Sequence, residues 1–203
     1  MRRVLILSNI INIDKNIIEN SFIIGVDKGA YIAALNNIQM DIAIGDFDSI
    51  NPSMLDTIKL FTKKIIKLNS IKDKTDTDEA LDLCDNNDEI IILGGIQGKR
   101  IEHFIANIIQ LKNHPNLIIM DDNSLIETKT ESFKPRCNYK FISFFSLTDS
   151  SIISLKGFSY PLDSYQLKNN DPLCISNEIN SNDSYVTIKE GRLLVIYSKD
   201  DNI

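Results

Sequence analysis

The chain has 203 residues, of which 43% are hydrophobic and 25% are charged, a composition typical of an ordinary globular protein. Its formal net charge of −6 at pH 7 argues against nucleic acid as a partner, because a phosphate-binding surface needs clustered Lys and Arg. The sequence contains no apolar run long enough to cross a bilayer, and its first apolar stretch is too short for a secretory signal, so we expect no membrane partner.

The first part of the chain alternates short apolar runs with segments of helical spacing. Strands are predicted at residues 4–7, 22–26, 42–44, 65–67, 89–93 and 117–120, and helices at 30–36, 52–61, 76–84 and 101–112. This alternation predicts a parallel sheet with helices on its faces. We therefore expect a Rossmann-like α/β domain over residues 1–123.

After residue 123 the pattern changes to short runs of β type at residues 141–147, 152–155, 173–176, 185–188 and 193–197. Turn-rich pieces such as Leu162-Asp163-Ser164 separate them, and Glu190-Gly191 is typical of a hairpin turn. No long helical pattern occurs here. We therefore predict an all-β domain over residues 124–203, a small antiparallel sandwich or barrel.

The cysteines are Cys84, Cys137 and Cys174, odd in number and far apart. Because no C-x-x-C spacing occurs, the sequence supports neither a zinc site nor a disulfide framework. A reduced, cytoplasmic setting fits this cysteine usage best.

An acidic segment, Gly45-Asp46-Phe47-Asp48-Ser49, follows a predicted strand. In extended chain, residues two apart point the same way, so Asp46 and Asp48 would present two carboxylates together while Phe47 points away. Close carboxylates repel, and a divalent cation removes that penalty. Magnesium prefers one or two protein carboxylates together with phosphate oxygens. D-x-D also occurs as a solvated turn, but its place at a strand end favours a magnesium and nucleotide site.

A second acidic segment spans residues 72–80. Thr75 is predicted to cap a helix with Asp78 three residues later, and acids favour the first helical turn. Capping explains Asp76 and Asp78 as well as function does, and the sequence leaves this choice open. Capping does not explain Asp73, which could join Asp46 and Asp48 at the same edge of the sheet.

A glycine loop containing Gly94, Gly95 and Gly98 leads into the predicted helix at residues 101–112. Free backbone N–H groups and the helix dipole make such a loop an anion site. Arg100, His103 and Asn107 fall at helical spacing on one polar stripe of that helix. The Arg100 guanidinium could hold a triphosphate bidentately.

Together these segments resemble the thiamine pyrophosphokinase family. The matching pieces are Asp27-Lys28-Gly29-Ala30, residues 45–49, residues 72–78, and Gly94-Gly95 through Arg100, His103 and Asn107; residues 157–162 and 176–178 are similar to the family's thiamine-binding half. The resemblance therefore covers nearly the whole chain, in order.

The resemblance implies that the hydroxyl of thiamine attacks the β-phosphorus of ATP and that AMP leaves. It implies Mg²⁺ as cofactor, held by Asp46, Asp48 and Asp73, with one of them a possible proton acceptor. The residues implied to bind ATP and its phosphates are Asp27, Thr75, Asp76, Gly94, Gly95, Gly98, Arg100 and His103. Those implied to bind thiamine are Ser176, Asn177 and Tyr160, the last in place of a stacking tryptophan, which the chain lacks. A homodimer with the thiamine site between subunits is also implied.

Two other functions remain open from the residues. A phosphatase of the haloacid dehalogenase type also has a D-x-D after a strand, although on its first strand, and it leaves residues 73–78 and the glycine loop unexplained. A non-catalytic nucleotide-binding sensor would bind ATP with magnesium and form no AMP.

Overall fold

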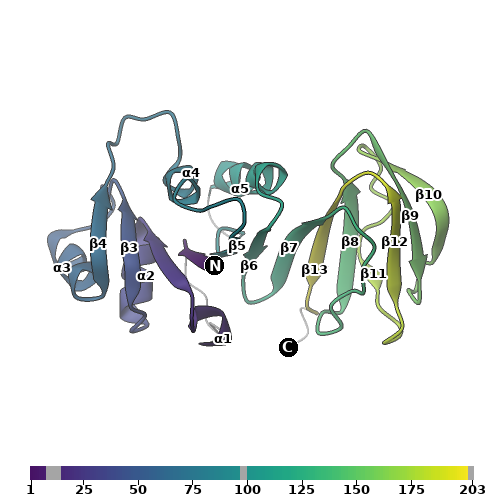
Figure 1. Cartoon of the computed structure of the whole chain (residues 1–203), viewed down its shortest axis with the longest axis horizontal. Coiled ribbons are helices and arrows are strands. Elements are labelled where there is room, and N and C mark those ends of the chain that lie inside the picture. The colour runs from purple at the N-terminus through teal and green to yellow at the C-terminus, as the bar shows by residue number, and fades with distance from the viewer. Residues whose placement is uncertain (8–14, 97–99, 201–203) are drawn as a thin grey trace. The chain divides into compact units, whose positions relative to one another are not determined.

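The computed structural model of the chain describes residues 1–7, 15–96 and 100–200. It separates into two compact units, Met1–Asp122 and Asn123–Ile203, called here unit 1 and unit 2. Figure 1 shows helices only within the first of them. No helix in the described ranges is long and apolar enough to span a membrane.

Unit 1 contains a parallel sheet whose described strands run in the order β4-β3-β2-β1-β5-β6. The strands are β1 (Arg2–Ile6), β2 (Phe22–Val26), β3 (Met40–Gly45), β4 (Thr62–Lys67), β5 (Glu89–Leu93) and β6 (Leu117–Met120). These match the predicted strands, with β1, β3 and β4 beginning two or three residues earlier than expected. The parallel α/β fold class is confirmed for this half of the chain.

The helices of unit 1 follow sequence signals at their amino ends. They are α1 (Lys15–Ile18), α2 (Lys28–Leu35), α3 (Pro52–Leu60), α4 (Asp76–Leu81) and α5 (Ile101–Asn113). At α3 the Asn51 side chain accepts a hydrogen bond from the Met54 N–H, and Pro52 occupies the first turn, where its missing N–H costs nothing. Helix α4 ends three residues before the predicted end. Helix α1 was not predicted, because four residues are too few to show a period.

Small residues allow α2 to pack closely on the sheet. Ala30, Ala33 and Ala34 are buried against the strands. Buried Val and Ile side chains of β1 and β2 complete this cluster, each contributing about 1.5–3 kcal/mol by leaving water. Strands β1, β2 and β5 have consecutive buried residues and are therefore covered on both faces, as expected for a parallel sheet. The packed residues of the cluster are Val4, Ile6, Ile23, Ala30, Ala33, Ala34, Met40, Ala43, Phe47, Ile58, Ile91 and Leu93.

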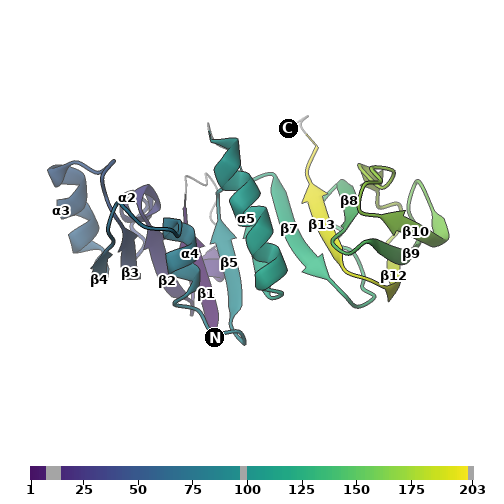
Figure 2. The same ribbon diagram turned by 90° about the horizontal axis from the view of Figure 1, so that it is seen from above.

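The strand order reverses direction between β1 and β5, which lie side by side. The chain leaves β1 toward β2 on one side and leaves β5 toward β6 on the other. Because such crossovers are right-handed, the two directions send their helices to opposite faces and open a crevice at the carboxyl ends of β1 and β5. Figure 2 shows α4 and α5 together on one side of this part of the sheet.

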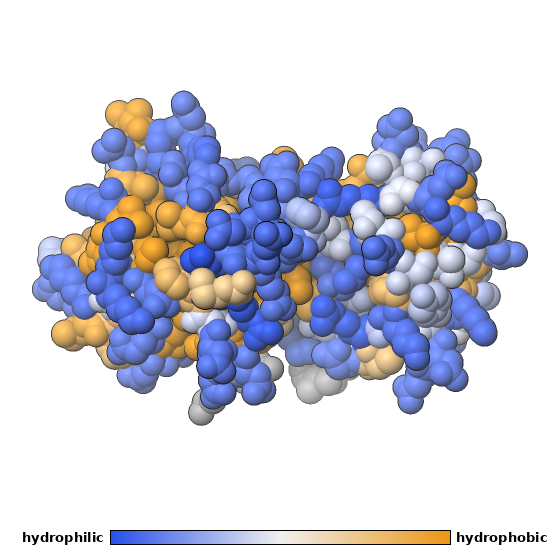
Figure 3. All heavy atoms as spheres, viewed as in Figure 1, coloured by the Kyte–Doolittle hydropathy of each residue, from blue (hydrophilic) through white to orange (hydrophobic). Residues whose placement is uncertain are grey.

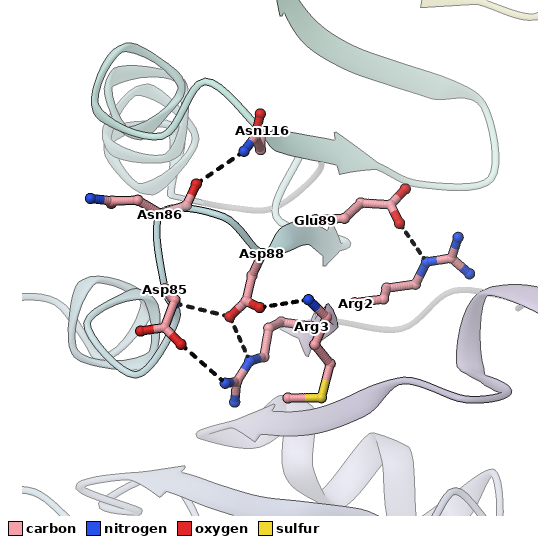
Figure 4. A network of polar contacts seen from close by, with 8 residues as sticks. Arg2, Arg3, Asp85, Asn86, Asp88, Glu89 and Asn116 are labelled. Carbon is pink, nitrogen blue, oxygen red and sulfur yellow. Dashed lines mark hydrogen bonds and ion pairs between the residues drawn. The ribbon is translucent and has the colours of Figure 1, made fainter.

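The opposite, amino-terminal edge of the same strands is held by an ionic network (Figure 4). Asp88 accepts hydrogen bonds from the Arg3 guanidinium at 2.8 Å, from the Met1 amino nitrogen at 2.9 Å and from the Asp85 N–H at 2.9 Å. These donors, the Asp85 N–H first and then the Met1 amino group and Arg3, lower the pKa of Asp88 well below its ordinary value. The network ties the start of β1 to the start of β5.

Unit 2 consists of antiparallel strands in two sheets, as its predicted fold class requires. One sheet has the order β11-β8-β13-β7 and the other β10-β9-β12. The strands are β7 (Ser124–Lys129), β8 (Phe141–Ser146), β9 (Ser150–Lys156), β10 (Leu162–Lys168), β11 (Asn177–Glu178), β12 (Tyr185–Glu190) and β13 (Leu193–Ser198). Alternate residues of β8 and β9 are buried, including Phe144 and Ile153, and Phe144 contacts Phe158 edge to face.

Three expectations for unit 2 were wrong. Leu162-Asp163-Ser164 was expected to be a turn but begins β10, an edge strand whose register shifts there while Ser164 takes a positive φ of 50°. Residues 173–176 were expected to form a strand but form a turn and a bend, and Ser176 takes a positive φ of 52° that a strand does not allow. Glu190-Gly191 does not close a hairpin, since β12 pairs with β9 whereas β13 pairs with β7 and β8. Strand β7 was not foreseen.

Hydrophilic side chains cover most of the face drawn in Figure 3, in keeping with the charged composition.

Candidate active site

A pocket of about 200 Å³ lies at the carboxyl ends of β1, β2 and β5, where the strand order predicts a crevice. Its walls come from the ends of these strands, from the first turn of α4 and from one side of α5. The lining residues are Leu7, Val26, Asp27, Lys28, Thr75, Asp76, Thr77, Gly95, His103 and Asn107.

Asp27 lies directly after β2 with an unusual backbone, φ 46° and ψ −120°. Its N–H donates to the Ile44 carbonyl of the neighbouring strand at 2.8 Å. A Cβ on Gly45 would lie 2.9 Å from the Asp27 Cα, so the glycine allows β3 to end this close to the pocket. The Ser49 hydroxyl reaches Asp27 Oδ2 at 3.4 Å, whereas Oδ1 is buried with no hydrogen-bond partner among the described residues.

The acidic residues around Asp27 are close enough to repel its charge. Burial raises the pKa of the Asp27 carboxyl above its ordinary value, and the carboxylates of Asp76, Asp46 and Asp48 raise it further. The sheet edge therefore brings together acids that are up to 49 positions apart in the chain (76 − 27). Such a group of neighbouring carboxylates has an electrostatic cost that a bound cation would reduce.

The segment around Asp46 and Asp48 is a tight turn, where extended chain was expected. The Asp48 N–H donates to Asp46 Oδ1 at 3.1 Å, and Phe47 takes φ 57°. Phe47 is buried in the core of unit 1 with 7% of its surface exposed, while Asp48 is exposed. The side chains thus separate as predicted, but the turn, and not strand alternation, is the reason. A positive φ at Phe costs free energy, which its burial helps to offset.

The first turn of α4 contains both the expected cap and a pocket wall. Thr75 and Asp78 form a capping box, each side chain bonding the backbone N–H of the other. Asp76 faces the pocket and pairs with Lys72 at 2.8 Å. The hydrogen bond that Lys72 donates to Asp76 raises the pKa of Lys72, and the charge of Asp46 adds to this effect. Asp78 therefore serves in the capping box with Thr75, while Asp76 lines the pocket.

The glycine loop after β5 meets α5 at the pocket. Gly94 and Gly95 have φ values of 88° and 76°, and the Asn107 side-chain amide donates to the Gly95 carbonyl at 3.2 Å. His103, one turn earlier on the helix, lines the pocket. Gly98 lies outside the described residues. Arg100 does not line the pocket; its exposed guanidinium pairs with Glu102 at 2.8 Å.

Asp73 is exposed and lies outside the pocket lining. Among the described residues, no three His, Cys, Asp or Glu side chains converge as ligands of one metal ion. The pocket nevertheless fits a hard cation that takes most of its ligands from phosphate and water. Asp27 provides a buried oxygen with no partner within the described chain, and its neighbours Asp46, Asp48 and Asp76 supply only oxygen donors.

The three residues of unit 2 that were expected to bind thiamine differ in accessibility. Tyr160 is exposed, with 68% of the residue's surface accessible to solvent, and Ser176 is also exposed. Asn177 is buried, and its amide is used within the protein. Its Oδ1 accepts from the N–H groups of Tyr160 and Glu178 at 3.0 and 2.9 Å, and its Nδ2 donates to the Tyr160 carbonyl at 2.8 Å.

Sequence reasoning missed several residues in or beside the pocket. The motif at residues 72–78 assigns no role to Lys72, which lies outside the pocket lining but places a cation beside its acids by pairing with Asp76. Asn107 was placed on the polar stripe, yet its support of Gly95 depends on a positive-φ loop that no pattern reveals. Leu7 and Val26 enter the lining only because β1 and β2 are neighbours in the sheet.

The sequence matches the family model described as thiamin pyrophosphokinase, catalytic domain, over residues 13–120, and the one described as its vitamin B1 binding domain over residues 128–194. It is 31% identical over 191 residues to thiamine pyrophosphokinase of Bacillus subtilis (strain 168), a match that covers 90% of this chain and 89% of that protein. The crystal structure of the Bacillus subtilis enzyme is similar with a TM-score of 0.83 at 28% identity, over 98% of both chains.

The structure of the yeast enzyme has a TM-score of 0.80 at 14% identity and covers 97% of this chain and 86% of its own, which shows the shared fold alone. The resemblance that the motifs predict is therefore confirmed by independent matches to both halves of the chain. On these matches, the chain belongs to the thiamin pyrophosphokinase family.

Proposed function

We propose that the chain transfers the pyrophosphoryl group of ATP, the nucleotide that its family uses, to the hydroxyl of thiamine, in the cytoplasm and with Mg²⁺ as cofactor. The observation that carries the proposal is the pocket at the strand switch point, lined by Gly95 of the glycine loop, by His103 of α5 and by Asp27 and Asp76, with the charges of Asp46 and Asp48 close to Asp27. Backbone N–H groups of such a loop and an acidic edge suit a metal-bound polyphosphate.

In the proposed reaction the thiamine oxygen bonds to the β-phosphorus, the bond from that phosphorus to the oxygen of AMP breaks, and the hydroxyl proton passes to a carboxylate of the acidic edge. Asp46 and Asp48 would hold Mg²⁺, together with Asp73 as the sequence predicts. The bound ion would neutralise charge on the phosphate oxygens. The chain's own contribution is to hold the two substrates in line for the reaction, and such positioning accounts for much of the rate enhancement in phosphoryl transfer.

The phosphates would be held by the Gly94-Gly95 loop, with His103, Thr75, Asp76 and Asp27 lining the nucleotide site. Lys72 is a further candidate, because its ammonium group already lies at the acidic edge, 2.8 Å from Asp76. Arg100 would bind phosphate after its guanidinium breaks the exposed ion pair with Glu102 and pairs with the phosphate oxygens in its place. Gly98 completes the loop in the sequence.

Thiamine would contact unit 2 through Tyr160 and Ser176. The exposed ring of Tyr160 offers an aromatic face to thiamine's positively charged ring, a favourable cation–π arrangement. We also propose a homodimer with the thiamine site between subunits. Ile101, Ile105 and Ile109 follow one side of α5 and remain 67%, 51% and 51% exposed, as expected of a face that a second copy could cover. Size-exclusion chromatography with light scattering tests the dimer.

The deciding experiment is incubation of the purified protein with ATP, thiamine and magnesium, followed by chromatographic separation of the products. Thiamine diphosphate and AMP in equal amounts are expected. ATP converted only to ADP or phosphate would favour the phosphatase hypothesis, and binding of ATP with no turnover would favour the sensor. Family membership argues against both.

A further inference from the structure

Gln110 lies on the same side of α5 as the pocket residues His103 and Asn107, because Asn107 follows His103 by four residues and Gln110 follows Asn107 by three. It lies outside the pocket lining. Its Nε2 donates to Asp78 Oδ1 at 2.6 Å, in a partly buried contact between residues 32 positions apart. Among the described residues, this side-chain hydrogen bond joins α5 to α4, two helices that both contribute residues to the pocket lining.

Asp78 is the residue that shapes the α4 wall. Its Oδ2 accepts from the Thr75 N–H at 3.2 Å, and its own N–H donates to Thr75 Oγ1 at 3.1 Å. The turn that this capping box fixes carries Thr75, Asp76 and Thr77 into the pocket lining. Because α4 has only six residues, its own hydrogen bonds are too few to hold it rigidly.

The amide of Gln110 is oriented for this contact. The Asn113 side chain donates to Gln110 Oε1 at 3.3 Å, which directs the Gln110 NH₂ group toward Asp78. The two oxygens of Asp78 are thus divided between the Thr75 backbone and α5. A hydrogen bond to a carboxylate is about twice as strong as a neutral one, so its loss should be felt at the capping turn.

We propose that Gln110 is a positioning residue for nucleotide binding, which holds the Thr75–Thr77 wall at a fixed distance from the His103–Asn107 wall through Asp78. The proposal rests on the proposed function, because it takes the pocket to be the ATP site. Gln110 lies outside the pocket lining and would not itself contact the nucleotide. Its removal should weaken ATP binding and leave thiamine recognition nearly unchanged.

The test compares wild type with the single variants Gln110→Glu and Asp78→Asn and with the double variant Asp78→Asn/Gln110→Glu. Gln110→Glu places two carboxylates in contact, whereas the double variant reverses donor and acceptor and leaves an oxygen on residue 78 for the Thr75 N–H. The measurements are the Kd for ATP with magnesium by calorimetry, the KM values for ATP and thiamine, and Tm. Gln166→Glu is the control, since it makes the same change at an exposed hydrogen-bonded Gln on β10.

We expect Gln110→Glu to raise the Kd and KM for ATP about tenfold or more, as loss of a hydrogen bond to a charged group implies, with the thiamine KM within about twofold. The double variant should recover ATP binding to within about threefold of wild type, and Gln166→Glu should match wild type. ATP binding by Gln110→Glu within twofold of wild type would overturn the proposal. So would a double variant no better than Gln110→Glu, or ATP and thiamine KM values rising together. Because the calorimetry needs no turnover, an inactive wild type would refute the proposed reaction while these ATP-binding results still decide the role of Gln110.

Discussion

The side-chain nitrogen of Asn107 lies 3.2 Å from the carbonyl oxygen of Gly95 and directly beside the Gly95 Cα, where a Cβ would come within 2.7 Å of it. Asn107 is buried, and Gly95 has φ 76°. One side chain therefore supports the glycine loop and also occupies the space that any other residue at position 95 would need. The shape of the loop at the pocket depends on this pair.

Gly95→Ala should cost about 1–2 kcal/mol in free energy of unfolding from the positive φ alone, and it should raise the KM for ATP because the contact with Asn107 displaces the loop. Urea denaturation and steady-state kinetics measure the two effects. The double variant Gly95→Ala/Asn107→Ser removes the contact but not the strained φ, so only part of the stability should return. Wild-type kinetics in Gly95→Ala would show that the loop does not bind phosphate.

Asp46→Asn should lower kcat by about a hundredfold or more, the range typical of losing a residue that acts on the reacting groups. The fold should survive, because the substitution removes a charge that lies among repelling carboxylates and leaves the side-chain volume nearly unchanged. Product formation and Tm are the measurements. Asp56→Asn, the same change on the exposed surface of α3, is the control and should be fully active. Near-normal turnover of Asp46→Asn would overturn its assignment to the metal.

Asp27→Asn should stabilise the metal-free protein by about 1 kcal/mol or less, because it removes a half-buried charge with an unpartnered oxygen. The same substitution should weaken binding of ATP with magnesium. Thermal unfolding with and without ATP and magnesium separates the two effects. A lower Tm of the variant in the absence of ligands would show that the Asp27 carboxylate is satisfied within the free protein.

Asn177→Ala should destabilise unit 2 by roughly 2–3 kcal/mol, because three hydrogen bonds to backbone groups near Tyr160 are lost. Since these bonds fix the backbone that presents the Tyr160 ring, the KM for thiamine should rise more than the KM for ATP. Asn182→Ala, in the exposed turn after β11, is the matched control. Equal changes in the two KM values would show that Asn177 acts only on stability.

Asp88→Asn should lower Tm near neutral pH. The pKa of Asp88 is depressed in the folded protein, so its ionised form contributes stability above the ordinary carboxyl pKa, and that contribution is lost as pH falls below it. The Tm difference between wild type and variant should therefore shrink below about pH 4. Asp85→Asn is the control, because that carboxylate is exposed and 4.0 Å from Arg3. A Tm difference independent of pH would exclude an ionic cause.

The sequence by itself determined the fold class and the position of most strands in unit 1, because buried parallel strands are continuous apolar runs that few other elements produce. It also located the Thr75 cap, since capping depends on residues three apart in the chain. It failed at β10, whose single buried residue, Leu167, leaves no period to detect. It failed again at Glu190-Gly191, because pairing partners, not turn residues, decide whether two strands form a hairpin.

Only some of the residues of the site could be predicted from the sequence. The sequence supplied Asp27, Asp76 and His103, which lie next to strand ends or helix starts and so reach the sheet edge by local rules. Three contacts were decided by tertiary structure alone. They are the hydrogen bonds between the Asn177 amide and the Tyr160 backbone, the ion pair of Lys72 with Asp76, and the hydrogen bond from Gln110 to Asp78. The first and last of these contacts join distant parts of the chain, and the second depends on an irregular loop. Their geometry follows from how packed elements fix side chains, which no local pattern encodes.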